Sequence, residues 1–187
     1  MRILRILPGR GFRMKMMNGT LDPAIGVSAP SKTGNAAAAI VCGGMAVGVL
    51  DTFLAMSLWR IGPVIVYQSV ASGLLGRESF RGGLATAALG MFLHFFIATT
   101  AATVYWVASH NLPVMRKYMT AHWFPLGLSY GIAVYYFMQR VVLPLSNVTH
   151  GIQQPLWRVV SHLVGHAFLV GLPIAWFAQH YSEGDQG

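Results

Sequence analysis

The stretch AAAAIVCGGMAVGVLDTFLAMSLW, residues Ala36–Trp59, decides the fold class of this chain. It exceeds the roughly 20 residues that a helix needs to cross a hydrocarbon core about 30 Å thick, and its single charged residue is Asp51. Comparable apolar stretches follow at Leu84–Ser109, His122–Leu143 and Val159–His180. The sequence therefore predicts an all-α integral membrane protein, a bundle of four spanning helices.

The composition excludes most soluble enzyme classes. Hydrophobic residues make up 55% of the chain and charged residues 10%, whereas soluble domains carry about 25% charged residues. The segments outside the four stretches are too short to bury a core of their own. The sequence contains no GxxxxGK[ST], HExxH or CxxC motif, and its one cysteine, Cys42, cannot form an intrachain disulfide. We therefore expect a protein that is not an enzyme.

Three regions follow from the charge pattern. Residues 1–35 form a basic tail that we expect to be mostly irregular and cytoplasmic, residues 36–181 form the four-span domain, and residues 182–187 form a mobile acidic tail. The tail and the loop containing Arg116 and Lys117 hold eight Lys and Arg residues, against five on the opposite side when Arg140 and Arg158 are counted. The positive-inside rule then places both termini in the cytoplasm.

The same basic start sets the expected location and partners. We predict a bacterial inner membrane; the alternative is a mitochondrial inner membrane, because an Arg-rich run without acids also resembles a transit peptide. The net charge of +8 lies mostly beside the spans, so we expect the tail to contact anionic lipid head groups and expect no nucleic acid. Gly44-x-x-x-Gly48 and Gly127-x-x-x-Gly131 are spacings that let helices approach closely, within the bundle or in a homodimer.

A shorter segment, Ile61–Gly76, lies between the first two spans. It is uncharged and too short to cross the bilayer. Gln68, Ser69 and Ser72 fall on one helical face and the apolar residues on the other. The segment is predicted to be an interfacial or re-entrant helix that begins at Pro63 and ends at Gly76.

Polar residues from every span are predicted to lie at one depth. Counting about 1.5 Å per residue along antiparallel spans places Asp51, His94 and His166 at roughly 10–15 Å from the same membrane surface. His162 lies one turn from His166, and Gln139 and Arg140 lie near the same level. The sequence therefore predicts one intramembrane polar cluster, whose members are Asp51, His94, His162, His166, Arg140 and Gln139.

Several chemistries remain open for this cluster. His94 and His166 are candidate axial ligands of a haem b, and two His with one Asp are candidate ligands of a divalent metal. A carboxylate and two His are also suited to proton or solute transfer. A purely structural role is also open, because Asp51 would pair with Arg140 or a His when buried.

Spaced single residues carry a resemblance to known proteins: Leu93-His94-Phe95, Tyr105, Pro113, Gly127, Gly131, Pro144, Pro155 and Gly165-His166. Through these residues the chain resembles the YagU-like family of uncharacterised bacterial inner-membrane proteins. The segment Gln68–Gly76 is similar to one in related hypothetical proteins of proteobacteria. The chain departs from that family in its long basic tail and in lacking a large polar insertion between the first two spans. The resemblance implies a four-helix inner-membrane protein and implies no activity or catalytic residue.

These observations give a first hypothesis and two alternatives. The first is a non-enzymatic accessory or assembly partner of a membrane complex, because neither a catalytic signature nor a soluble domain is present. The second is a proton-linked or solute transporter or channel that uses the Asp and His residues. The third is an electron carrier that binds haem b through His94 and His166.

Overall fold

The computed structural model describes residues 32–119, 122–148 and 154–183. Within these ranges the chain is helical, with no β-strand, which confirms the all-α prediction. Three helices are long and apolar enough to cross a membrane: Ala36–Trp59, Gly83–Asn111 and Leu156–Ser182. They correspond to three of the four predicted spans.

The helices have the following bounds. The first half comprises α1 (Lys32–Trp59), α2 (Pro63–Leu75), the 3₁₀ helix η1 (Gly76–Arg81), α3 (Gly83–Asn111) and α4 (Pro113–Met119). The second half comprises α5 (Trp123–Phe137), the π-helix η2 (Met138–Val142), α6 (Leu143–Leu145), α7 (Leu156–Gly165), the π-helix η3 (His166–Gly171) and α8 (Leu172–Glu183).

Both predicted tails are shorter than expected. Helix α1 already begins at Lys32, so Lys32–Asn35 belong to the helix and not to an irregular tail. Helix α8 continues to Glu183, two residues into the predicted acidic tail. The remaining residues of both tails, 1–31 and 184–187, lie outside the described residues.

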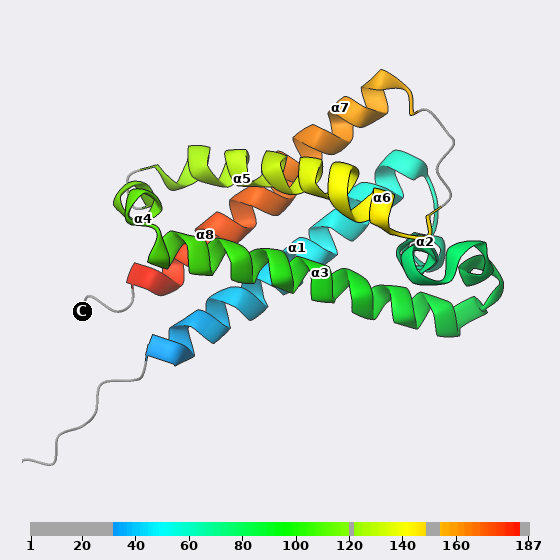
Figure 1. Ribbon diagram of the computed structural model, residues 1–187, viewed down its shortest axis with the longest axis horizontal. Coiled ribbons are helices and arrows are strands. Elements are labelled where there is room, and N and C mark those ends of the chain that lie inside the picture. The colour runs from blue at the N-terminus through cyan, green and yellow to red at the C-terminus, as the bar shows by residue number, and fades with distance from the viewer. Residues whose placement is uncertain (1–31, 120–121, 149–153, 184–187) are drawn as a thin grey trace, which may run out of the picture. The chain divides into compact units, whose positions relative to one another are not determined.

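The helices pack as antiparallel neighbours. Helix α1 contacts α3 and α8, while α5 lies against η3 and α8 (Figure 1). The start of α1 and the end of α8 lie toward the end of the domain where α4 joins α3 to α5, at the left of Figure 1. Helices α2 and α6 and the start of α7 lie at the opposite end, which we call the α2–α6 end.

The distribution of side chains is inverted relative to a soluble protein. Large apolar side chains point outward, among them Phe53, Leu84 and Phe92, which are 61%, 76% and 66% exposed. The buried residues are mostly small, such as Ala98, Ala102, Ala175 and Ala178. Lipid tails are as apolar as a protein core, so membrane helices associate through small residues that permit close packing.

Both predicted glycine motifs lie at contacts inside the chain. A Cβ atom on Gly44 would lie 2.7 Å from Cα of Thr99, and one on Gly48 would meet the ring of Phe95, so both glycines admit α3. A Cβ on Gly131 would meet the carbonyl oxygen of His166, and one on Gly127 would lie 3.0 Å from the oxygen of Gly171. The helices therefore approach backbone to backbone at Gly44, Gly127 and Gly131, while Gly48 makes room for an aromatic ring, as the packing prediction requires.

The predicted short helix between the first two spans is present as α2. It has Pro63 in its first turn and Gly76 at its C-cap with φ 62°, where a side chain would be strained. Two of its three predicted polar residues, Gln68 and Ser72, are buried, and Ser69 is exposed. Gln68 is 5% exposed, and its Nε2 donates to the carbonyl oxygen of Gly83 at 3.0 Å. Val64, Ile65 and Leu74 face outward.

The segment predicted as the third span, His122–Leu143, is helical from Trp123 to Leu145 through α5, η2 and α6. It is not among the three helices that are long and apolar enough to cross a membrane. Its tyrosines, Gln139 and Arg140 lower its apolar character, and the π-helical turn of η2 interrupts its α-helical hydrogen bonding.

Candidate functional site

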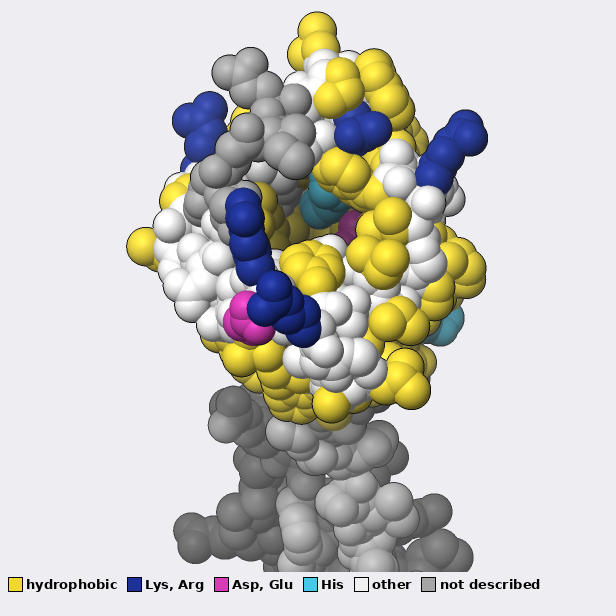
Figure 2. All heavy atoms as spheres, turned by 90° about the vertical axis from the view of Figure 1, so that its right-hand side faces the viewer, with side chains coloured by type: hydrophobic (Ala, Val, Ile, Leu, Met, Phe, Trp, Pro, Cys, Tyr) yellow, Lys and Arg dark blue, Asp and Glu magenta, His cyan; other side chains and the backbone are white. Residues whose placement is uncertain are grey.

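A cavity of about 220 Å³ opens at the α2–α6 end of the helices (Figure 2). Figure 2 looks into this end and shows a hollow with histidine and acidic side chains at its bottom and Lys or Arg side chains around its rim. Most of the lining is apolar. The polar lining residues are Asp51, His94, Tyr135, Gln139, His162 and His166.

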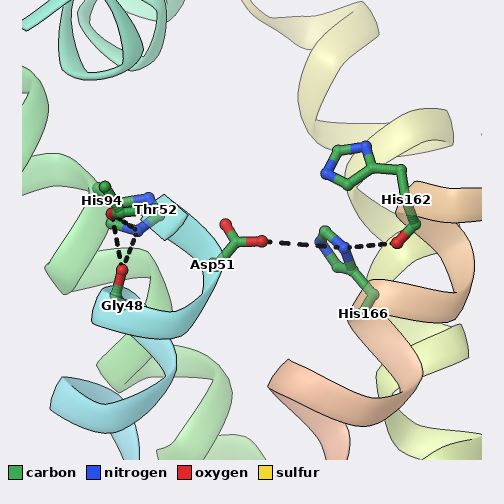
Figure 3. Close-up of polar contacts among 6 residues, drawn as sticks. All are labelled: Gly48, Asp51, Thr52, His94, His162 and His166. Atoms are coloured by element: carbon green, nitrogen blue, oxygen red, sulfur yellow. Dashed lines mark hydrogen bonds and ion pairs between the residues drawn. The ribbon is translucent and has the colours of Figure 1, made fainter. Parts of the chain in front are cut away.

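Asp51 and His166 face each other across the seam between α1 and η3. Oδ1 of Asp51 lies 3.9 Å from Nδ1 of His166, and these side chains are 23% and 9% exposed. Nδ1 of His166 donates a hydrogen bond of 3.1 Å to the carbonyl oxygen of His162 (Figure 3). Oδ1 of Asp51 is buried and accepts no hydrogen bond from any described residue. A buried oxygen of this kind is costly without a partner.

His162 completes a three-residue cluster, Asp51–His162–His166. His162 and His166 are spaced i, i+4, so they share one face of their helix, and their ring centroids are 4.6 Å apart. One potential ligand atom from each of the three residues lies within 4.8 Å of the other two. Two imidazoles and a carboxylate at this separation can hold a cation or hydrogen-bond a small polar molecule.

Tyr135, which belongs to α5, contacts the imidazole rings of both His162 and His166. Its ring centroid lies 5.6 Å from that of His162 and 5.4 Å from that of His166, edge-on in both cases. Tyr135 follows Gly131 by one turn, and Gly131 lets the α5 backbone rest against the His166 carbonyl. The glycine therefore sets the distance at which the tyrosine meets the histidines. Sequence reasoning missed Tyr135; the signal was its i+4 spacing from a glycine predicted to lie at a contact.

Two π-helical turns border the cavity. Segment η3 begins at His166 itself, and η2 contains the lining residues Met138 and Gln139. A π turn inserts one residue into the helical repeat, so it rotates the side chains that follow relative to those that precede it. Such turns are frequent at functional sites because they re-aim side chains at some cost in backbone hydrogen bonding.

His94 does not join the cluster, although it lines the cavity. Its Nε2 donates to the carbonyl oxygen of Gly48 at 2.9 Å and lies 3.2 Å from Oγ1 of Thr52. Thr52 also donates to the Gly48 oxygen at 2.7 Å and lies 3.3 Å from the hydroxyl of Tyr67. Figure 3 shows His94 and Thr52 on one side of α1 and Asp51 on the other. The set predicted as one cluster is thus divided between two sides of this helix.

The two remaining predicted residues also separate. Gln139 lines the cavity, whereas Arg140 is exposed and is not part of the lining. In the described part of the chain, the residue that forms an ion pair with Asp51 is His166, and Arg140 does not. The expected pairing of Asp51 with Arg140 is therefore not found, while its alternative, a contact with a histidine, is.

The pair His94 and His166 does not fit a haem iron. Nε2 of His94 is the ring nitrogen that reaches farthest from the backbone, and it already donates to Gly48. A nitrogen that carries a donated proton has no lone pair for a metal. The residues that do fit a metal ion are those of the Asp51–His162–His166 cluster.

The cavity is closed on its inner side by packed side chains. Val47 and Val170 line it, and both belong to a buried apolar core that continues through Ala102, Tyr105 and Ile174 toward the other end of the helices. Ile174 is 2% exposed and Tyr105 is fully buried. This buried apolar core therefore lies between the polar site and the other end of the helices.

An arginine lies above the cluster on its own helix. Arg158, His162 and His166 follow one another at single-turn spacing, so they share a face of α7. The Arg158 guanidinium lies 4.5 Å from the ring centroid of Trp59 and 5.0 Å from that of Trp157. These cation–π contacts hold its charge beside the two tryptophan rings, one helical turn from His162.

No family model, curated protein or solved structure matches this chain. What the cavity binds must therefore be inferred from the chain's own residues. The resemblance to the YagU-like family stays an expectation, and it carries no activity that would decide between the alternatives.

Proposed function

We propose that this chain is a four-span membrane protein that binds a small polar ligand in a cavity reached from one side of the membrane. The supporting observation is the cavity itself. Asp51, His162 and His166 gather at its bottom, and packed apolar side chains close it below. Ionisable groups inside spanning segments are costly, and they usually mark a ligand or ion site.

Helices α5, η2 and α6 together serve as the fourth span in this proposal. They form an unbroken helical run beside η3 and α8, and they present Ile132, Phe137 and Leu145 outward. Gln139 turns its polar group into the cavity instead of the lipid. Neighbouring helices cover Tyr135 of the run, whereas Arg140 stays exposed.

Helix α2 lies in the outer part of the bilayer without crossing it. Its 13 residues rise about 20 Å, short of a 30 Å core. Its outward residues Val64, Ile65 and Leu74 are apolar, while Gln68 and Ser72 face inward. A helix at a water boundary would show the reverse orientation, so lipid covers its outer side.

Four spans put both termini on one side, opposite the cavity mouth. The eight Lys and Arg residues of the amino-terminal tail and of the loop around Lys117 make that side the cytoplasm, in a bacterial inner membrane or, as the alternative, a mitochondrial inner membrane. Anionic lipid head groups would contact the tail. The cavity then opens away from the cytoplasm.

Ligand binding is favoured over a purely accessory role by one atom, Oδ1 of Asp51. A carboxylate that only pins helices together would use its buried oxygens for hydrogen bonds. Here that oxygen is buried and without a hydrogen bond among the described residues, and it lies at the bottom of a cavity. An open channel is not favoured, since the apolar core closes the inner half.

Cysteine accessibility tests this proposal. In a Cys42→Ala background, Gln139→Cys places a thiol in the cavity, whereas Phe137→Cys places one on the outer surface two residues away; Phe137 is 57% exposed. A membrane-impermeant thiol reagent should label Gln139→Cys in intact cells and should leave Phe137→Cys unlabelled, because thiols in lipid do not ionise. Labelling of Gln139→Cys from the cytoplasmic side, or from both sides, contradicts the proposal.

A further inference from the structure

We propose that Asp51, His162 and His166 bind one divalent transition-metal ion of the Zn²⁺ class. This inference rests on the proposed function, since it names the ligand of the same cavity. One potential ligand atom from each residue lies within 4.8 Å of the other two. In a tetrahedral site with metal–ligand bonds of about 2.0–2.2 Å, ligand atoms lie about 3.4 Å apart. Small side-chain rotations close that difference.

The surroundings of His166 already match a metal ligand. Metal-bound imidazoles usually donate their other ring N–H to a carbonyl or carboxylate, which fixes the tautomer and the ring orientation. Nδ1 of His166 donates in this way to the carbonyl oxygen of His162 at 3.1 Å. Its second nitrogen is left with a lone pair, and the edge of Tyr135 limits rotation of the ring.

The Asp51 oxygen that accepts no hydrogen bond from a described residue gives an independent reason for a cation. Oδ1 is buried, makes no hydrogen bond to a described residue, and lies 3.9 Å from the nearest histidine nitrogen. A divalent ion between the carboxylate and the imidazoles supplies the missing partner, and it offsets the cost of placing a charge in a low-dielectric site.

The ligand types select the class of ion. Two imidazole nitrogens and one carboxylate oxygen suit Zn²⁺, Fe²⁺, Co²⁺ or Ni²⁺, whereas Mg²⁺ and Ca²⁺ prefer oxygen alone. Three protein ligands leave a fourth position open. That position faces the cavity, where a water molecule or a solute group would complete the coordination.

The positively charged rim of the cavity predicts how the rate of Zn²⁺ binding depends on salt. Lys or Arg side chains surround the rim of the hollow (Figure 2), and like charges repel an approaching cation. Salt screens that repulsion over about 10 Å at 0.1 M ionic strength. Zn²⁺ binding should therefore become faster as salt is added, whereas adventitious binding to exposed acidic groups should weaken.

The test uses the full chain in mild detergent, purified through a tag without histidine and stripped with a chelator. Zn²⁺ and Co²⁺ are titrated, and bound metal is counted by mass spectrometry after dialysis. We expect one equivalent per chain and a visible Co²⁺ spectrum of a low-symmetry N/O site. Asp51→Asn and His166→Gln should each weaken binding at least tenfold. The matched control His180→Gln, at the far end of α8, should change nothing.

Two measurements keep the outcomes separable. Gel filtration and thermal unfolding show whether each variant folds, and Asp51→Asn is nearly isosteric, so its loss of metal is readable. Absence of a bound equivalent in the wild type, or equal binding by Asp51→Asn, overturns the metal site. If Zn²⁺ does not bind but Gln139→Cys is still labelled from one side, the cavity proposal stands and the metal proposal fails. If Zn²⁺ binds but the Gln139→Cys thiol is not labelled, the metal site stands and the proposed access to the cavity fails.

Discussion

Gly131→Ala should separate α5 from η3 and loosen the Asp51–His162–His166 cluster. The added Cβ would lie 2.8 Å from Cα of Ala167 and 2.9 Å from the carbonyl carbon of His166, and it would overlap the His166 oxygen. Carbon atoms pack best at about 3.5–4.0 Å, so the two backbones must part by roughly 1 Å. These contacts are backbone atoms, which cannot turn aside as a side chain would.

The magnitude follows from a matched substitution. A Cβ on Gly43, in α1, would meet Cβ of Phe177 at 3.6 Å and Cβ of Ala102 at 3.8 Å, which are ordinary contacts. Both glycines are buried in helices, so both substitutions gain the same backbone preference for alanine. The difference between them isolates the overlap, for which overpacking predicts about 1–3 kcal/mol.

Reversible unfolding in mixed micelles, titrated with SDS, measures that difference. Gly43→Ala should unfold at the same SDS fraction as the wild type or a higher one, and Gly131→Ala at a clearly lower one. Zn²⁺ affinity should also fall in Gly131→Ala, because Tyr135 and His166 move apart. Equal stability of the two variants would refute the close approach of α5 and η3.

Two further predictions concern other polar groups. Tyr130→Phe should lower the free energy of unfolding by about 1 kcal/mol, because the Tyr130 hydroxyl donates to the Ala101 carbonyl at 2.7 Å. Tyr105→Phe should be neutral or stabilising, because the buried Tyr105 hydroxyl has no hydrogen-bond partner among the described residues. The same SDS titration compares the two variants. Arg158→Gln should speed Zn²⁺ binding at low salt and reduce its dependence on ionic strength, as stopped-flow measurements with a zinc indicator would show; an unchanged rate would mean that the ion arrives by another route.

The level of a residue along the helix axes could be predicted from the sequence, and rotation about those axes could not. Counting residues along antiparallel spans brought Asp51 and His166 to one level, and they do meet. The same count placed His94 beside them, yet His94 lies on the other side of α1 with Thr52. Rotation depends on which small residues admit a neighbouring helix, here Gly48, and on π turns that arise from packing.

The apolar content of each stretch decided how clearly a membrane span could be predicted from the sequence. Three stretches were readable because their mean hydropathy is high, 1.6 to 1.9, and α2 was readable from Pro63 and Gly76. The stretch from Trp123 to Leu145 is ambiguous by composition because it contains several tyrosines, Gln139 and Arg140. Two of these polar residues, Tyr135 and Gln139, line the cavity.

The inward polar side of α2 bears on how the chain is made. Gln68 finds its acceptor on Gly83, and the carbonyl of Tyr67 lies against Gly90, so both partners are synthesised after α2 itself. Until α3 leaves the ribosome, the side chain of Gln68 in α2 lacks the Gly83 carbonyl that accepts its hydrogen bond. The translocon would therefore have to hold α1 and α2 at its lateral gate and release them with α3 as one hairpin-like unit.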